Sequence, residues 1–130
     1  MITVYTDGSV DPAEQEAGIG WILTDATGEE ITHNSRIEYR ESTSAEWLGV
    51  IHALSWIATH RDTDRVMIHT DSNSLAEVAD GKSTPTAQST HRWYGRFRKL
   101  TTYFDTVRVH SIASAHNRKA DRLARTAYRN

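Results

Sequence analysis

The feature that most constrains this chain is an amphipathic segment, residues 44–60, with β-rich segments on both sides of it. Thr43 and Glu46 match a capping box at its start, which predicts a helix. Two strands that a helix connects within one sheet run parallel, because such a crossover cannot join antiparallel neighbours. The segment therefore predicts an α/β fold with helices on the faces of a mixed sheet. The apolar residues at helical spacing are Trp47, Val50, Ile51, Leu54, Ile57 and Ala58.

The β-rich segments before this helix predict three consecutive strands. Turn signals at DPAEQE and DATGE separate them, which is typical of an antiparallel meander. After the helix, the pattern predicts a strand, two helices, another strand and a final helix, in the overall order βββαβααβα. The expected strands are 2–6, 17–24, 30–39, 65–70 and 105–112, and the expected helices are 44–60, 72–79, 88–102 and 117–128.

Length and composition limit the classes of function. A chain of 130 residues without repeats or linkers fits one domain, which we expect to span residues 1–130. Cysteine is absent, which excludes thiolate nucleophiles and cysteine zinc sites and leaves carboxylate, imidazole and hydroxyl chemistry. The longest apolar runs are a few residues, so we expect neither a membrane span nor a secretory signal, and a cytoplasmic location.

Charge is distributed unevenly along the chain, although the net charge is only −2. Residues 1–80 hold 15 acidic and 4 basic residues, a balance of −11. Residues 81–130 hold 11 Lys and Arg against 2 Asp, a balance of +9. The acidic part could attract cations and the basic part a polyanion; alternatively, the two parts neutralise each other across the folded surface.

Four carboxylates stand near the ends of expected elements. Asp7 follows the first strand, Asp71 ends the fourth, Glu46 lies in the first turn of the first helix, and Asp121 lies early in the last helix. Ligands of α/β sheets bind beyond the carboxyl ends of strands, so the first three are expected to meet, with Asp121 as a fourth. Oxygen ligands without His or Cys suit Mg²⁺ or Mn²⁺. The local alternatives are a turn for Asp7, the capping box for Glu46, a helix cap for Asp71 and an ion pair with Arg125 for Asp121.

The motifs TDGS, AEW, TDS and HNRKADRLA, in this order along nearly the whole chain, resemble those of the type 1 ribonucleases H. The resemblance implies a ribonuclease H-like sheet of five strands in the order 3-2-1-4-5, the first three antiparallel, with helices on both faces. It implies an endonuclease that hydrolyses the RNA strand of RNA–DNA hybrids with two Mg²⁺ or Mn²⁺ ions and leaves 5′-phosphate and 3′-hydroxyl ends. It places Asp7 on both ions, Glu46 and Asp71 on one, and Asp121 on the other. The expected partner is the hybrid; no organic cofactor is expected, and the protein is expected to be a monomer.

The sequence departs from that family at two places. The family often carries two asparagines three and four residues before the glutamate, where this chain has Ser42 and Thr43. The glycine-rich loop with a histidine that precedes the last acid in longer relatives is shortened, so His116 is a candidate catalytic replacement, or simply an exposed histidine. Asn117 fits the family's helix cap, and Asn73 matches a substrate-contacting amide or is itself a cap.

The expected helix 88–102 interleaves aromatic and basic residues. Trp93 lies among Arg92 and Arg96, which favours a channel for the hybrid; the alternative is that Trp93, Phe97 and Leu100 form the core face of this helix. Small polar groups beside the acids are expected to contact 2′-hydroxyls, which distinguish RNA from DNA. The expected substrate contacts are Gly8, Ser9, Ser42, Thr43, Asn73, Arg92, Trp93, Arg96 and Asn117.

Two other functions remain open on the sequence alone. One is a non-catalytic module that binds a hybrid or a single strand through the basic residues. The other is a different nuclease or strand-transfer enzyme, because a fold and a metal site do not determine which polynucleotide is cut.

Overall fold

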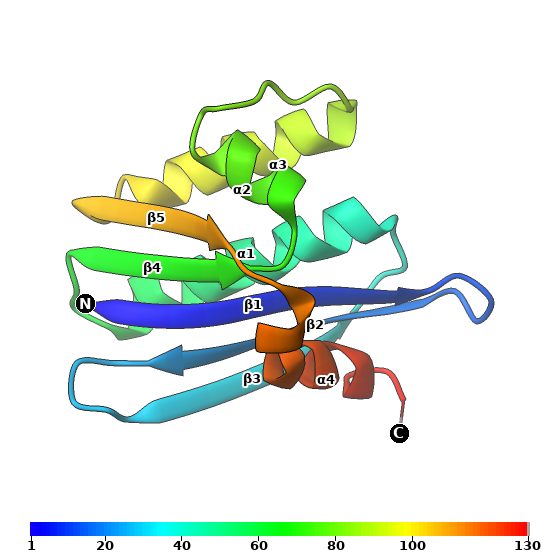
Figure 1. The fold of residues 1–130 in the computed structure, drawn as a ribbon, viewed down its shortest axis with the longest axis horizontal. Coiled ribbons are helices and arrows are strands. Elements are labelled where there is room, and N and C mark those ends of the chain that lie inside the picture. Colours follow the sequence, from blue (N-terminus) through cyan, green and yellow to red (C-terminus); the bar gives the residue numbers. More distant parts are fainter. Residues whose placement is uncertain (130) are drawn as a thin grey trace.

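The computed structural model describes residues 1–129, and these residues form one five-stranded sheet with four α-helices and a short 3₁₀ helix (Figure 1). The strand order is β3-β2-β1-β4-β5. β1 pairs antiparallel with β2, and β2 with β3, whereas β4 runs parallel to both β1 and β5. The mixed sheet and its order are therefore confirmed. The strands are β1 (Ile2–Asp11), β2 (Glu16–Thr24), β3 (Glu30–Ile37), β4 (Arg65–Thr70) and β5 (Thr106–Ser111).

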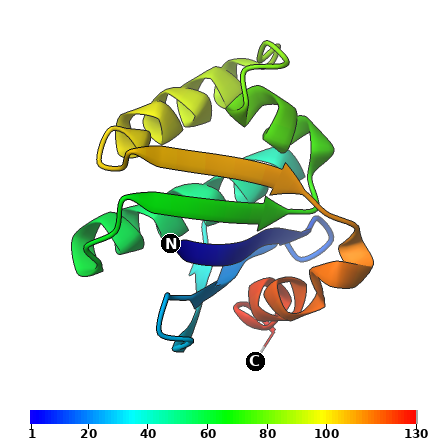
Figure 2. The same ribbon diagram turned by 60° about the vertical axis from the view of Figure 1, so that its left-hand side comes forward.

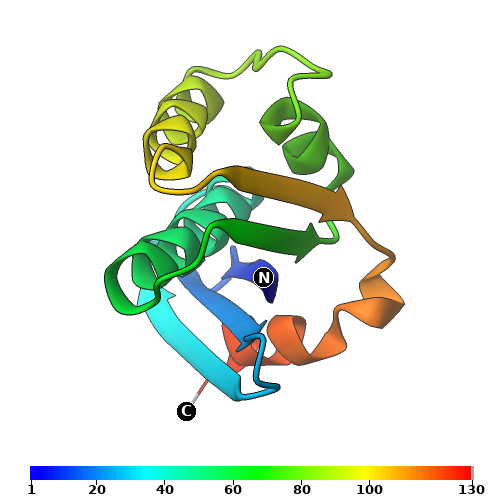
Figure 3. The same cartoon turned by 90° about the vertical axis from the view of Figure 1, so that its left-hand side faces the viewer.

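The helices cover the two faces of the sheet unequally. Seen along the sheet in Figure 3, α1 and α3 lie on one side, and α4 lies on the other. Helix α4 packs against β1, β2 and β3. In Figure 2, α4 lies to one side of β4 and β5 and does not cover them. No helix among residues 1–129 is both long and apolar enough to cross a membrane. The helices are α1 (Ser42–His60), α2 (Asn73–Ala79), α3 (Gln88–Thr101), η1 (Ser114–His116) and α4 (Arg118–Thr126).

Strand β1 is longer than the sequence indicated, and this difference determines where Asp7 lies. β1 was expected to end at Thr6, but it continues to Asp11 because β2 pairs with it from Thr3 to Asp11. Its parallel pairing with β4 stops earlier, at Tyr5 opposite His69. Asp7 therefore lies inside a strand, at the place where one neighbouring strand has ended and its edge is open.

The core fills the space between the sheet and α1. The apolar face predicted for α1 is buried, with Trp47, Val50, Leu54 and Ile57 fully inaccessible to solvent. These side chains belong to one cluster with residues of β1, β2 and β4 and with Trp93 of α3. Burial of each large apolar side chain contributes about 1.5–3 kcal/mol, so this cluster anchors α1 firmly on the sheet.

The start of α1 differs from the expected capping box. The residue that caps the helix is Glu41, and Ser42 is already helical, so Thr43 does not cap the helix. The Ser44 hydroxyl donates a hydrogen bond of 2.6 Å to Glu41 Oε1. Glu46 is consequently free of a capping role.

Two glycines allow α1 to approach β1 unusually closely. A Cβ atom on Gly8 would lie 2.3 Å from the backbone carbon of Ala45, and one on Gly49 would lie 2.9 Å from the Asp7 carbonyl oxygen. Such distances leave no room for any side chain. The contact brings the backbone of Glu46 beside Asp7.

Glycines of β2 play the same part for α4. A Cβ atom on Gly20 would lie 2.6 Å from the backbone nitrogen of Ala124 and 2.6 Å from Leu123 Cβ. Gly95, in contrast, lies in α3 with no atom within 4 Å of its would-be Cβ. A methyl group therefore has no space at Gly20 but has space at Gly95.

We expect Gly20→Ala to lower the free energy of unfolding by about 1–3 kcal/mol, because α4 must move away from the sheet to accommodate the methyl group. The matched variant Gly95→Ala is expected to raise it by about 0.5–1 kcal/mol, since alanine loses less conformational entropy in an exposed helix position. Chemical denaturation of both variants measures these changes. Equal effects of the two substitutions would contradict the close contact between β2 and α4.

Candidate metal centre

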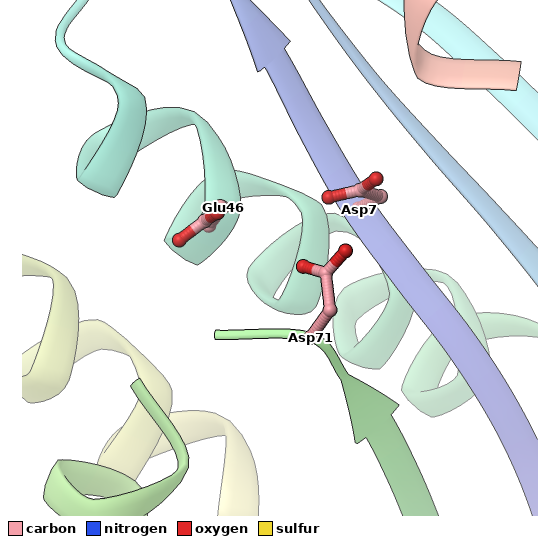
Figure 4. Close-up of side chains that lie close together, drawn as sticks. All are labelled: Asp7, Glu46 and Asp71. Carbon is pink, nitrogen blue, oxygen red and sulfur yellow. The ribbon is translucent and has the colours of Figure 1, made fainter. Parts of the chain in front are cut away.

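Three of the four predicted carboxylates meet at the carboxyl end of β4. Figure 4 shows Asp7 on β1, Glu46 on α1 and Asp71 directly after β4, with the Asp71 carboxylate directed toward Asp7. One oxygen atom from each of the three lies within 4.8 Å of the others. The predicted meeting of these three residues is therefore present in the structure.

The local alternatives for these three carboxylates are wrong. Asp7 is a strand residue paired opposite Gly20, so it does not form a turn. Glu46 belongs to no capping box, as described above. The side chain that caps α2 belongs to Ser72, whose hydroxyl accepts from the Leu75 backbone N–H at 3.2 Å. Since local backbone roles do not account for the acids, their proximity calls for another explanation.

Asp7 is the most strongly perturbed of the acids. Asp7 is only 5% exposed, and its pKa is raised to about 8. Burial is the largest cause, the charge of Asp71 is the next, and the charges of Asp121 and Glu46 have smaller effects. A hydrogen bond of 2.9 Å from the Gly8 backbone N–H to Asp7 Oδ1 acts in the opposite direction. Without a nearby cation, Asp7 therefore holds a proton at neutral pH.

The other two acids are perturbed in the same direction. Burial raises the pKa of Glu46, and the charge of Asp71 adds to this, while a hydrogen bond with Ser72 opposes it. Burial also raises the pKa of Asp71, as does the charge of Asp121, while a hydrogen bond with Asn117 opposes it. The three groups thus share an environment in which negative charge is unfavourable unless a cation compensates it.

Asn117 connects the last helix to the site. It occupies the cap position of α4, as predicted, but its side chain makes no capping hydrogen bond. Instead the amide, in a residue 2% exposed, donates through Nδ2 to the Thr6 carbonyl oxygen at 2.9 Å, while its Oδ1 has no partner. Asn117 therefore ties α4 to β1 immediately before Asp7.

Asp121 stays apart from the other three acids in the structure. Its carboxylate is paired with the Arg125 guanidinium one helical turn further on, as the local alternative predicted. Its charge nevertheless raises the pKa of both Asp7 and Asp71, so it lies near the cluster. Of the four carboxylates predicted to converge, three form the cluster in the structure, and Asp121 lies near it without joining it.

The chemistry of the three carboxylates fits a divalent cation. All donor atoms are oxygens, which Mg²⁺ and Mn²⁺ prefer. The raised pKa values of Asp7, Glu46 and Asp71 mean that a cation between them would relieve their mutual repulsion. Binding would also displace a proton from Asp7, which couples cation uptake to pH.

Gly8 and Ser9 are already engaged within the protein. Gly8 packs on the α1 backbone, which is the reason a glycine is needed there. The Ser9 hydroxyl lies 2.7 Å from the Tyr128 hydroxyl. Their predicted substrate contacts would have to use the backbone of Gly8 and the remaining hydrogen-bonding capacity of Ser9.

Four other predicted residues lie on exposed surface. Ser42 and Thr43 are in the first turn of α1, and Asn73 begins α2 without capping it. His116 ends η1, exposed to solvent, and is not one of the three clustered residues. These positions leave the side chains accessible, and their roles remain predictions.

Trp93 corrects the channel interpretation. The residue is 3% exposed and belongs to the core cluster, so the alternative core assignment is the one present in the structure. Its indole N–H donates to the Ser44 hydroxyl at 2.7 Å. The guanidinium groups of Arg40, Arg92 and Arg96 lie 5.4–5.9 Å from the ring centroid. The tryptophan thus supports a group of arginines instead of offering its own face to a base.

Sequence reasoning missed two contributors to this region. Ser72 caps α2 and counteracts the rise in the pKa of Glu46, and the pattern TDS pointed only to the acid before it. Arg40 precedes α1 and reaches Trp93 of α3, a contact between segments distant in the sequence. The close approach of α1 to β1 was not predicted either, although Gly49, a glycine in the middle of a helical pattern, is a signal for it.

Comparisons with known proteins agree with this geometry. A family model described as reverse transcriptase-like matches residues 5–127, nearly the whole chain. A search of curated proteins gives no match.

Solved structures similar to this chain include three ribonucleases H. RNase H1 from the halophilic archaeon Halobacterium salinarum is 26% identical, with a TM-score of 0.88 over 97% of this chain and 96% of that one. An N-terminal RNase H domain from Mycobacterium tuberculosis is 21% identical, with a TM-score of 0.88 over 97% and 91%. LC11-RNase H1, isolated from compost by a metagenomic approach and solved with an RNA/DNA hybrid, is 21% identical, with a TM-score of 0.87 over 98% and 96%.

The raised pKa of Asp7 predicts how stability depends on pH. Between pH 3.8, the ordinary pKa of an aspartate, and about pH 8, the folded protein holds a proton on Asp7 that the unfolded chain has lost. Rising pH therefore favours unfolding in this window, by up to about 1.4 kcal/mol per pH unit for one proton. We expect the metal-free protein to be less stable at pH 7.5 than at pH 5, and Asp7→Asn to reduce this difference, as measured by thermal unfolding in chelator. An Asp7→Asn protein with an undiminished difference would contradict the assignment.

Proposed function

The chain belongs to the reverse transcriptase-like family as a member of the type 1 ribonucleases H, and from this premise we propose that it is a nuclease that hydrolyses the RNA strand of RNA–DNA hybrids. The observation that carries the proposal is the cluster of Asp7, Glu46 and Asp71, with oxygens within 4.8 Å of one another and raised pKa values. The hybrid held by LC11-RNase H1, a protein of the same fold, supports this choice of substrate.

The clustered acids would hold the catalytic cations. Asp7, the most buried carboxylate, would be shared between two ions, with Glu46 and Asp71 on one and Asp121 on the other. When bound, divalent ions supply an activated water and stabilise negative charge at the phosphate and the leaving 3′ oxygen. The carboxylates are not consumed, and the expected products carry 5′-phosphate and 3′-hydroxyl ends.

The chain's own groups position the acids. The Asn117 amide donates to the Thr6 carbonyl oxygen and so fixes the relation of β1 and α4, and it also favours the ionised form of Asp71. The Ser72 side chain, which caps α2, favours the ionised form of the Glu46 carboxylate. Such restraint matters because catalytic groups must stay close to the reactive geometry.

The group of arginines around Trp93 would bind the hybrid backbone. Arg40, Arg92 and Arg96 converge on one ring; Arg40 is paired with Glu38 at 3.7 Å, but Arg92 and Arg96 form no ion pair within residues 1–129, which favours an anionic partner. Guanidinium groups match phosphate geometry well. We assign this group to the DNA strand.

Exposed hydroxyls and amides in the first turns of α1 and α2, from Ser42, Thr43 and Asn73, would distinguish the 2′-hydroxyls of RNA.

Several expectations from the sequence stay predictions. They are a catalytic contribution from His116, a monomeric state, a single domain and a cytoplasmic location.

The proposed activity is tested with a panel of hybrid, duplex RNA and duplex DNA substrates in Mg²⁺ or Mn²⁺, analysed on gels. We expect cleavage of the RNA strand of the hybrid and a loss of about 10²-fold or more in rate for Asp7→Asn, since the variant lacks the central cation ligand. The matched variant Asp62→Asn, at an exposed position, is expected to keep the wild-type rate. Hybrid binding without cleavage would favour the non-catalytic alternative, and preferred cleavage of another duplex would favour a different nuclease.

Arg92→Ala combined with Arg96→Ala is expected to raise the KM for the hybrid and to flatten the salt dependence of binding. Each lost phosphate contact should reduce the slope of log K against log salt concentration by about 0.7–0.9. Arg65→Ala, which removes an exposed cation from β4, is the control. If both proteins show the same slope, the assignment of this arginine group to the hybrid is wrong.

A further inference from the structure

A depression outside the three-acid cluster opens beside Asp121. It is open to solvent, encloses about 410 Å³ and lies where η1 meets α4. Three of its lining residues are arginines. The lining residues are Ser114, Ala115, Arg118, Asp121, Arg122 and Arg125.

The three arginines follow one stripe of α4. Arg118, Arg122 and Arg125 are four and three residues apart, so they lie on one face of the helix. All three are exposed. The stripe thus presents several guanidinium groups to the same volume.

Two of these arginines lack a compensating carboxylate. Within residues 1–129, neither Arg118 nor Arg122 forms an ion pair, whereas the neighbouring cation Lys119 pairs with Glu30 at 3.6 Å. Arg125 is paired only with Asp121. The depression therefore carries uncompensated positive charge beside a carboxylate expected to hold a cation.

We propose that this depression is a subsite for a phosphodiester of the RNA strand, next to the phosphate that is cut, and that Arg125 couples its occupation to Asp121. The proposal rests on the proposed function and extends it. Arginine is suited to this role because its planar guanidinium binds phosphate oxygens in a bidentate manner.

The position of the stripe identifies the strand. Asn117, directly before α4, donates to the Thr6 carbonyl oxygen next to Asp7, so the depression at the start of α4 borders the place where the strand is cut. Helix α4 lies on the opposite side of the sheet from α3, whose arginines we assign to the DNA strand (Figure 3). The two arginine groups would hold the substrate from different sides of the acidic centre.

Arg125 is a positioning residue in this scheme. In the free protein its guanidinium occupies the Asp121 carboxylate. A phosphate in the depression offers Arg125 a second anionic partner, and transfer of the guanidinium to it frees the carboxylate for a cation. Substrate binding would thereby make Asp121 available as the fourth carboxylate ligand of the cations.

The subsite is tested by hybrid binding in chelator, where no cleavage interferes. Arg118→Ala combined with Arg122→Ala should reduce the salt slope by about 0.7–0.9 for each lost contact. Arg108→Ala, which removes an exposed cation from β5, should leave the slope unchanged apart from the smaller effect of net charge. A double variant that behaves like Arg108→Ala overturns the subsite.

The coupling is tested by calorimetric titration with Mn²⁺ in the absence of nucleic acid. Arg125→Ala should bind Mn²⁺ about two- to fivefold more tightly, because the competing ion pair on Asp121 is gone. Arg125→Lys keeps a cation opposite Asp121 and should stay close to the wild-type affinity. Equal affinities for Arg125→Ala and wild type overturn the coupling.

These results separate the subsite from the nuclease activity. A reduced slope in the double variant together with no cleavage of any hybrid would retain the subsite and refute the proposed function. Hybrid cleavage together with an unchanged slope would retain the function and refute the subsite.

Discussion

The structure depends on one close contact between a helix and a strand. Gly8 of β1 and Gly49 of α1 have no side chains, so the two backbones come together where any Cβ atom would collide. This contact places Glu46 beside Asp7, and the end of β4 then places Asp71 beside both. Without the two glycines, α1 would lie further from the sheet and the carboxylates would be separated. The acidic centre is therefore a consequence of backbone packing.

The same packing makes the centre electrostatically unfavourable by itself. Burial is the largest cause of the raised pKa of Asp7, Glu46 and Asp71, and the charges of neighbouring acids, Asp121 among them, add to it. A protein can tolerate such a group of acids when the remaining structure is well anchored, and here a core that includes Trp21, Trp47 and Trp93 provides that anchoring. The cost is relieved when protons or cations are bound, so stability and function are linked at one place.

Much of the fold was predictable because local patterns determine it. The alternation of the β-rich segments and the helical spacing of α1 led to the correct mixed sheet, and the resemblance to the type 1 ribonucleases H implied its strand order. The errors arose where distant segments decide. β1 is longer than its apolar pattern because β2 pairs with it beyond Thr6. A smaller, local error is the start of α1, where Glu41 and not Thr43 occupies the N-cap position. Trp93 is buried because α3 packs on α1, a contact that its basic neighbours do not reveal.

By itself, the sequence determined the kind of chemistry available: oxygen ligands, no thiols, and an excess of acids in one part and bases in the other. It also indicated that Asp7, Glu46 and Asp71 come together, because residue patterns placed β1, α1 and β4 to within a few residues even where the end of β1 and the start of α1 were wrong. Only the tertiary structure decided that Asp121 lies near the other three acids without joining their cluster, and that Asn117 bonds to β1 instead of capping its own helix. Those outcomes depend on how α4 lies against the sheet, which is set by contacts between residues more than a hundred positions apart and leaves no local pattern.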